Sequence, residues 1–294
     1  VGHPCFKADG VTGWQKGGDV PFYGSVMSVA PKERLAVVVL GASGRFGSGS
    51  ATIVAERILL KALAETGRIA SMPGPVATKP APAKKSSGDE ADSSGGYYAN
   101  NSTLLKVKAG PGGSLDIVTY DAAKGSWKDW LVGVGLREDG YWSTDAAASP
   151  AVSFVKAEGR SYMVVRMAKG YGHYTDSFTY AQKVGPTSKP QAAWNEKRLG
   201  TTWLLVNEHP DFIDKWKTPV FRLRSIDGMI FADWADLQIV DASTSDARAV
   251  MTLLIPQSNG TGLNDVVIET RSGEEWVRFG SYLFRPAQGI GVLK

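Results

Sequence analysis

Strand-length segments separated by turn signals recur at short, regular intervals from residue 97 onward. The turns are marked by runs such as Pro111-Gly112-Gly113 and Glu158-Gly159. In the first half of this region the expected strands cover residues 104–107, 114–120, 130–136, 141–143, 151–156, 161–167 and 177–183. So many short strands in so short a span are typical of a closed antiparallel barrel.

A second set of strands follows the first. These strands are expected over residues 202–206, 220–225, 228–232, 237–241, 249–255, 265–272, 274–279 and 282–285. The spans 97–184 and 199–286 are almost equal in length, and each opens with a glycine and an aromatic residue. We therefore expect a degenerate internal duplication that gives two antiparallel barrels, over residues 97–188 and 189–294. The aromatic content of 10% agrees with a mainly β chain.

The first seventy residues predict a different, α+β unit. Asp9-Gly10 is a hairpin signal between two strands. The continuous apolar run 35–40 predicts a central strand that is covered on both faces. A helix that begins near Ser50 and stops at Gly67 is expected to cover the sheet with an inner face that includes Ile58.

Residues 71–96 join the two regions and are rich in Pro, Ala and Ser. Such a composition predicts a semi-extended linker. The alternative is an ordered segment that wraps over a neighbouring domain.

One short motif in the first unit carries chemical meaning. Lys16-Gly17-Gly18 lies on an expected strand and is followed by Asp19. Glycines let backbone N–H groups come close to a reacting carbonyl, and a cation beside them holds an anionic group. The motif is therefore suited to one part of an acyl-transfer site.

With its context, this motif resembles that of a known family. The run from Trp14 to Ser25, the Ala30-Pro31 turn, the apolar strand and the terminal helix resemble the end of the transpeptidase domain of the β-lactamase and penicillin-binding-protein-like serine hydrolases. The family includes class C β-lactamases, family VIII esterases and D-aminopeptidases. The resemblance covers residues 1–70, with glycine at Gly17 where the family usually has threonine.

The resemblance implies roles for four residues. Lys16 would face an anionic substrate group or tune the catalytic base, and Gly17 would take part in the same motif. The backbone N–H near Gly18 or Asp19 would be an oxyanion-hole donor. The implied reaction is acyl transfer through a serine ester on a small amide or ester, as in a peptidase, an esterase or a β-lactamase, with no metal or other cofactor. The plan, an α+β remnant of a transpeptidase-like domain followed by two lipocalin-like barrels, is similar to D-aminopeptidase-type enzymes.

The family's other two motifs, Ser-x-x-Lys and Tyr-x-Asn, have only lookalikes in this chain. Ser153 and Lys156 have the right spacing, but they lie on an expected strand, where they point to opposite faces. Tyr98 and Asn100 come after Lys16 in the chain, whereas the family has its Tyr-x-Asn motif before its lysine motif. We therefore expect the nucleophile in an N-terminal catalytic part that precedes Val1 or forms a separate chain. Alone, the chain should be inactive.

A glycine- and tyrosine-rich loop over residues 169–176 contains Tyr171, His173 and Tyr174. By the resemblance, a barrel loop of this kind can lean into a catalytic cleft and limit substrate size; the alternative is a plain hairpin connection. The three histidines share no metal-ligand spacing, so no metal site is expected.

Charge and hydropathy limit the partners. The net charge of +4 is mild, and no basic stripe with interleaved aromatics points to nucleic acid. No apolar stretch is long enough for a membrane span. A periplasmic or secreted location is favoured over the cytoplasm because relatives of the resembled family are often found there.

A non-catalytic function is the main alternative to the hydrolase. The paired barrels could hold a small apolar ligand in their interior or contact another protein, because barrels of about eight strands have interiors either filled by side chains or large enough for one small ligand. A third possibility is a structural appendage that limits access to a neighbouring active site.

Overall fold

The structure is a computed structural model. It describes residues 3–20, 23–42, 48–73, 79–86, 88–145, 150–169, 174–186, 190–208, 219–234, 236–256 and 264–288. The chain divides into two compact units. The first consists of Val1–Ala81, Asp145–Ala151 and Val165–Ser177, and the second of Pro82–Thr144, Val152–Val164 and Phe178–Lys294.

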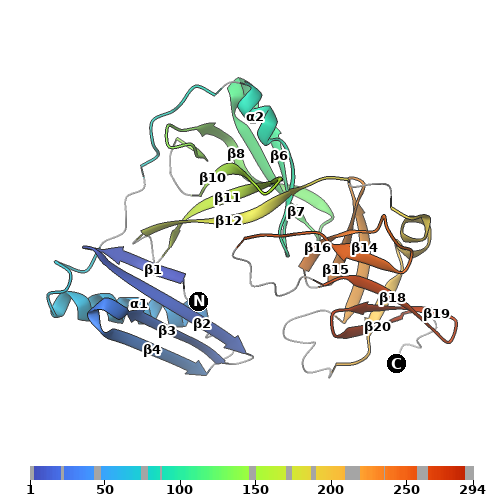
Figure 1. The fold of residues 1–294 in the computed structure, drawn as a ribbon, viewed down its shortest axis with the longest axis horizontal. Coiled ribbons are helices and arrows are strands. Elements are labelled where there is room, and N and C mark those ends of the chain that lie inside the picture. Colours follow the sequence, from blue (N-terminus) through green and yellow to red (C-terminus); the bar gives the residue numbers. More distant parts are fainter. Residues whose placement is uncertain are drawn as a thin grey trace. The chain divides into compact units, whose positions relative to one another are not determined.

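The first unit contains a four-stranded antiparallel sheet in the order β1-β2-β3-β4 (blue in Figure 1). Its strands are β1 (His3–Ala8), β2 (Val11–Val20), β3 (Tyr23–Ala30) and β4 (Leu35–Ala42). Asp9 and Gly10 both have positive φ, at 46° and 81°, so the expected Asp-Gly hairpin is confirmed.

Helix α1 (Ser48–Glu65) packs on one face of this sheet. Leu59, Leu60 and Leu63 are fully buried against the sheet, whereas Ile58 is half exposed. The prediction that Ile58 lies on the inner face was therefore wrong. The next residue, Leu59, lies there instead. The helix ends where expected, with Gly67 in the left-handed region and the Arg68 N–H bonded to the carbonyl of Leu63.

β4 corrects another expectation. Val37 and Val39 pack towards α1, but Val38 and Leu40 on the opposite face are 61% and 77% exposed. Among the described residues, β4 is an edge strand covered on one face only. A strand that is apolar at every position has two faces that favour burial. The sequence of the strand does not show whether another element covers the second face.

Three buried polar atoms lie in the layer between α1 and the sheet. Glu56 on α1 is 1% exposed, and Ser28 on β3 pairs across the strands with Gln15 on β2. Within the described part of the chain, no hydrogen-bond partner is found for Glu56 Oε1, Ser28 Oγ or Gln15 Oε1. Burial raises the pKa of Glu56 to about 7.

The segment expected to be a linker is ordered in part. The backbone N–H of Lys84 donates to the carbonyl of Leu136, at 2.9 Å, and that of Glu138 donates to the carbonyl of Pro82, at 3.0 Å. Helix α2 (Gly88–Ser94) follows and contacts β6. Residues 82–86 and 88–94 therefore lie against the first barrel, as the alternative of an ordered wrap supposed.

The first barrel is closed by eight strands, as expected for an antiparallel barrel. They are β5 (Gly96–Ala99), β6 (Leu104–Ala109), β7 (Leu115–Asp121), β8 (Ser126–Leu136), β9 (Trp142–Ser143), β10 (Ala151–Ala157), β11 (Arg160–Lys169) and β12 (Tyr174–Val184). Pairing of β12 with β5, for example Gln182 with Ala99, closes the ring.

The second barrel is also closed and contains eight strands (orange and red in Figure 1). They are β13 (Thr202–Leu205), β14 (Val220–Ile226), β15 (Met229–Trp234), β16 (Asp236–Asp241), β17 (Arg248–Met251), β18 (Val266–Arg271), β19 (Glu274–Phe279) and β20 (Tyr282–Pro286). β13 closes the barrel because it pairs with both β14 and β20.

Side chains fill the interior of the second barrel. Phe221 lies at the centre of an aromatic group, with ring centroids 5.1 Å from Phe284 and 5.6 Å from Phe279. Trp203 and Trp234 complete this buried group. The described interior is therefore a packed core, which argues against a small ligand held inside this barrel.

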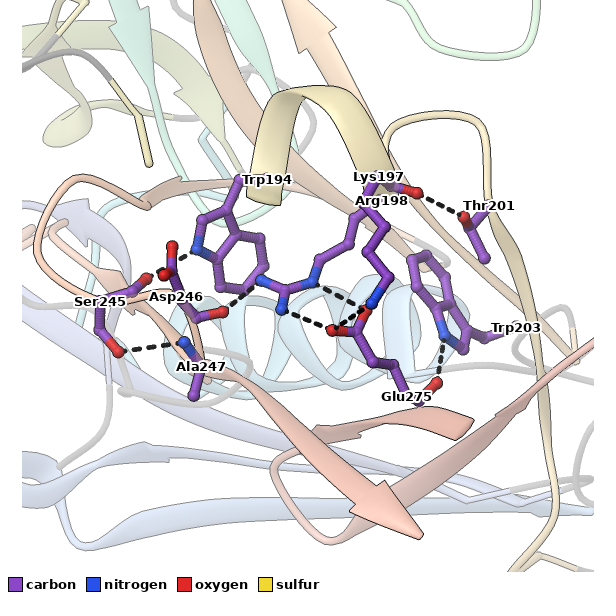
Figure 2. Close-up of polar contacts among 9 residues, drawn as sticks. All are labelled: Trp194, Lys197, Arg198, Thr201, Trp203, Ser245, Asp246, Ala247 and Glu275. Atoms are coloured by element: carbon purple, nitrogen blue, oxygen red, sulfur yellow. Dashed lines mark hydrogen bonds and ion pairs between the residues drawn. The ribbon is translucent and has the colours of Figure 1, made fainter. Parts of the chain in front are cut away.

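A π-helical turn (Ala193–Arg198) packs against this core. Figure 2 shows its Arg198 guanidinium lying between Trp194 and Glu275. The guanidinium carbon is 4.4 Å from the Trp194 ring centroid, and Arg198 Nη2 is 3.0 Å from Glu275 Oε1. Trp203 Nε1 donates to the Glu275 carbonyl at 3.1 Å. Glu275 thus connects three elements: its carboxylate binds the turn, and its backbone carbonyl on β19 accepts from Trp203 of β13.

Replacing Glu56 should remove a pH dependence from the first unit. The raised pKa means that folding favours the protonated form, so stability falls as the pH rises from about 4.5 to about 7, by roughly 3 kcal/mol. Glu56→Gln should stabilise the unit by about 2 kcal/mol at pH 8 and change little at pH 4. Hydrogen exchange of the α1 amides measures this, with the exposed Glu65→Gln as control. Equal exchange in wild type and Glu56→Gln across this range would contradict the prediction.

Removing the Glu275 charge should destabilise the second barrel. Arg198 is buried, with a side chain only 5% exposed, and would lose its counter-ion. We expect Glu275→Gln to lower the free energy of unfolding of the barrel by about 2 kcal/mol, less than the loss of a fully buried partner would.

The same ion pair predicts a pH dependence in the wild type. The Arg198 hydrogen bonds hold the pKa of Glu275 below its usual value, so the stabilisation should be lost as the pH falls below about 4.5.

Hydrogen exchange of the β13 and β19 amides measures this change. The matched control is Glu274→Gln, whose ion pair with Arg285 is exposed and long, at 3.5 Å. Equal effects of the two substitutions would show that the buried pair is not special.

Candidate functional site

The Lys16-Gly17-Gly18 motif lies in the exposed half of β2. In this half the strand pairs with β3, with Lys16 opposite Met27 and Gly18 opposite Ser25. β1 pairs with β2 only as far as Gln15. Among the described residues, the second edge of β2 is therefore unpaired from Lys16 onward, which leaves backbone hydrogen-bonding groups available there.

The motif shares one face of the sheet with exposed apolar side chains. Residues that pair across antiparallel strands point to the same face, so Lys16 lies beside Met27, which in turn pairs with Val38. In the same way, the row of Gly18 and Ser25 continues to Leu40. The large apolar members of this outer face are 39–77% exposed: Trp14, Tyr23, Met27, Val38 and Leu40.

The polar groups of this face are a lysine, a serine hydroxyl and backbone groups of the glycines. Lys16 forms no ion pair with any residue that the structure describes. Ser25 Oγ donates to the Gly18 carbonyl at 3.1 Å, and a Cβ at Gly18 would meet only this hydroxyl. A free cation, an open strand edge and a glycine surface can hold an extended amide or ester. Nothing is described of the Asp19 side chain, although its backbone belongs to β2.

The lookalike motifs have structural roles. Ser153 and Lys156 lie on β10, so the strand-like interpretation of that run is confirmed. Tyr98 is buried, and its hydroxyl donates to the Ser94 carbonyl. Asn100 Oδ1 accepts the N–H groups of Ser102 and Thr103 and so organises the β5–β6 turn. Neither pair forms a nucleophile and base.

The three predicted gating residues cannot be placed as a group. Tyr171 and His173 lie outside the described residues, and Tyr174 opens β12 with no description of its side chain. Among the described residues, no cluster of His, Cys, Asp or Glu could hold a metal ion. No helix in that same part of the chain is long and apolar enough to cross a bilayer.

Sequence analysis missed a pocket between the two barrels. Arg160 and Gln182 of the first barrel line it together with Thr252 and Leu254 of the second. No local pattern relates residues that lie 72 positions apart, as Gln182 and Leu254 do.

Comparisons with known proteins give little guidance. No family model matches the sequence, and no curated protein matches it. One solved structure with some similarity is described as the crystal structure of SurE with D-Leu, at 17% identity and a TM-score of 0.34. The match covers 62% of this chain and 38% of that one. A score this low supports no conclusion about fold or function.

These comparisons contradict the expected membership of the β-lactamase-like family. Neither a model of that family nor a relative from it matches residues 1–70. The sheet and helix are present, but they are not shown to be a transpeptidase remnant. The resemblance rested on Lys16-Gly17-Gly18, and a glycine-rich strand after a hairpin forms by ordinary strand pairing without any such ancestry.

Proposed function

We propose that this chain forms one wall of a hydrolase site that acts by acyl transfer on an amide or ester. The observation that carries the proposal is the edge of β2 that no described residue pairs, beside Lys16, for which the described residues supply no counter-ion. The reaction needs a serine nucleophile, which would come from a polypeptide segment outside residues 1–294.

The open edge supports the binding of a substrate backbone. An extended amide can add to an unpaired strand edge through main-chain hydrogen bonds. A backbone N–H near Gly18 could then serve as one donor to the oxyanion that forms during acyl transfer, a contact worth about 3 kcal/mol in known enzymes.

Lys16 supports a preference for an anionic substrate group. Its ammonium lies on the exposed face and has no described counter-ion to compete with a ligand. A charge-assisted hydrogen bond to a carboxylate is about twice as strong as a neutral one.

The apolar outer face supports the presence of a covering partner. Trp14, Val38 and Leu40 lie on the face that carries Lys16, and water-exposed apolar clusters of this kind mark interaction sites. We propose that the nucleophile-bearing catalytic part covers this face, whether it belongs to the same product or to a separate chain.

Labelling in native cells tests the proposal. The tagged chain is captured with its partners and treated with a fluorophosphonate, and hydrolysis of a p-nitrophenyl ester is followed in parallel. We expect an adduct on a serine outside residues 1–294 and a loss of kcat/KM of about tenfold or more in Lys16→Ala, the size expected for a charge-assisted contact.

The variant Gly18→Ala should fold normally, because its added Cβ makes only one ordinary contact. The methyl group should nevertheless hinder the approach of the substrate and so lower kcat/KM.

The control is Lys32→Ala, which removes an exposed lysine from the turn before β4. An active complex whose kcat/KM is unchanged by Lys16→Ala would overturn the role of Lys16. The absence of both adduct and hydrolysis would overturn the hydrolase itself.

A non-catalytic protein-binding module is the second candidate function, and the exposed apolar face favours it. It predicts that a partner co-purifies with the chain without any serine adduct. Substitution of Leu40 by Asp should then release that partner.

A further inference from the structure

A pocket of about 460 Å³ opens where the two barrels meet. The first barrel contributes Arg160 and Gln182, and the second contributes Met229, Ile239 and Met251. The volume falls within the range of small-molecule sites, about 300–1,000 Å³. Since the described interior of the second barrel is packed, this pocket is the better-placed space for a ligand.

The walls of the pocket are fixed by hydrogen bonds between the barrels. Arg160 Nη1 donates to the Thr252 carbonyl at 3.2 Å, and the Leu254 N–H donates to Gln182 Oε1 at 2.8 Å. The Tyr162 hydroxyl donates to the Leu254 carbonyl at 3.0 Å. An apolar cluster that includes Leu104 of the first barrel and buried residues of the second extends the contact. The pocket is therefore preorganised rather than a loose crevice.

Some hydrogen-bonding groups at this pocket have no described partner, and those of Gln182 and Arg160 are N–H donors. Gln182 is only 7% exposed, and its Oε1 is occupied by Leu254 and Arg160, whereas no described residue accepts from its Nε2. Arg160 uses Nη1 for its described bonds, which leaves Nε and Nη2 without a described acceptor. Donors that include a guanidinium match a carboxylate.

Two other charged groups belong to the lining, Lys183 and Asp241. Lys183 Nζ donates to the Ser93 carbonyl at 3.2 Å, and Asp241 Oδ1 accepts the Ser243 N–H at 2.9 Å. Arg160 and Lys183 therefore give the described lining two cations, each with N–H donors to spare, against the one carboxylate of Asp241. Part of the remaining wall is apolar: Val184, Met229, Ile239, Met251 and Leu254.

We propose that the pocket between the barrels binds a small monocarboxylate with an apolar body, of the size class of a medium-chain fatty acid. The carboxylate accepts hydrogen bonds from Arg160 and Gln182, and the hydrocarbon lies along the aliphatic wall. This site is independent of the proposed hydrolase site on β2.

Calorimetric titration of the full chain with decanoate at pH 7 tests the proposal. Decanol, decylamine and leucine are the comparison ligands, because they alter the head group or replace the long apolar chain. We expect decanoate to bind with one site per chain and at least about tenfold more tightly than decanol, since only the carboxylate forms charge-assisted bonds.

Two variants locate the site. Arg160→Gln should weaken decanoate binding by about tenfold or more and leave decanol unchanged. Gly185→Phe should abolish decanoate binding, because Gly185 lines the pocket and a Cβ there meets no atom within 4 Å. The control Lys128→Gln removes an exposed lysine of β8 and should change nothing. Circular dichroism verifies that each variant is folded.

Three results would overturn the proposal. Equal affinity for decanoate, decanol and decylamine would indicate non-specific apolar adsorption. Tighter binding of leucine than of decanoate would assign the site to a zwitterion instead. Unchanged decanoate binding in folded Gly185→Phe would place the ligand elsewhere.

Discussion

The pairing of strand edges is the constraint on which this structure depends. An unpaired strand exposes a row of backbone donors and acceptors, so a sheet must close, be covered or accept a partner. Both barrels close completely, the second because β13 pairs with β14 and β20. The sheet of the first unit does neither in the described residues, since β2 has an open edge beyond Gln15.

The same contrast holds for apolar surface. In the second barrel the large side chains converge around Phe221, and Arg198 completes the packing by stacking on Trp194 while bound to Glu275. In the first unit, α1 buries one face of the sheet and leaves Leu40 and Val38 exposed on the other. Both barrels pair their strand edges, whereas the sheet retains the surfaces that a substrate or partner can use.

The sequence predicted those features that local patterns encode. Asp9-Gly10 and Glu158-Gly159 adopt the positive φ values that their hairpin signals require, and the recurring short strands form antiparallel barrels. Contacts between distant residues could not be predicted. Arg198 and Glu275 lie 77 positions apart, and neither belongs to a motif. The apolar run of β4 indicated surfaces that favour burial, but not which of them is buried in this chain.

The family resemblance failed for a related reason. Lys16-Gly17-Gly18 was placed correctly on a strand, but the chemistry of a site depends on groups brought together from elsewhere. The hydroxyl beside the motif, Ser25 Oγ, donates to the Gly18 carbonyl, and no described contact joins it to Lys16. What the described residues do provide is a cation, a glycine surface and an open edge on one face, and this combination supports a binding role for β2.

The most direct test of this account is residue-resolved amide hydrogen exchange on the complex captured from native cells, with and without a phosphonate ester that mimics the tetrahedral intermediate of acyl transfer. The account predicts that, of the two neighbouring amides of Gly17 and Gly18, the one that points to the open edge exchanges readily in the free complex and becomes at least about tenfold more protected with the phosphonate, as expected for an amide that gains a hydrogen bond. The other amide points to β3, because successive residues of a strand alternate in direction. Amides of β13–β20 should not change. Strong protection of both amides before addition of the phosphonate, or no change in either amide upon it, would contradict the central claim.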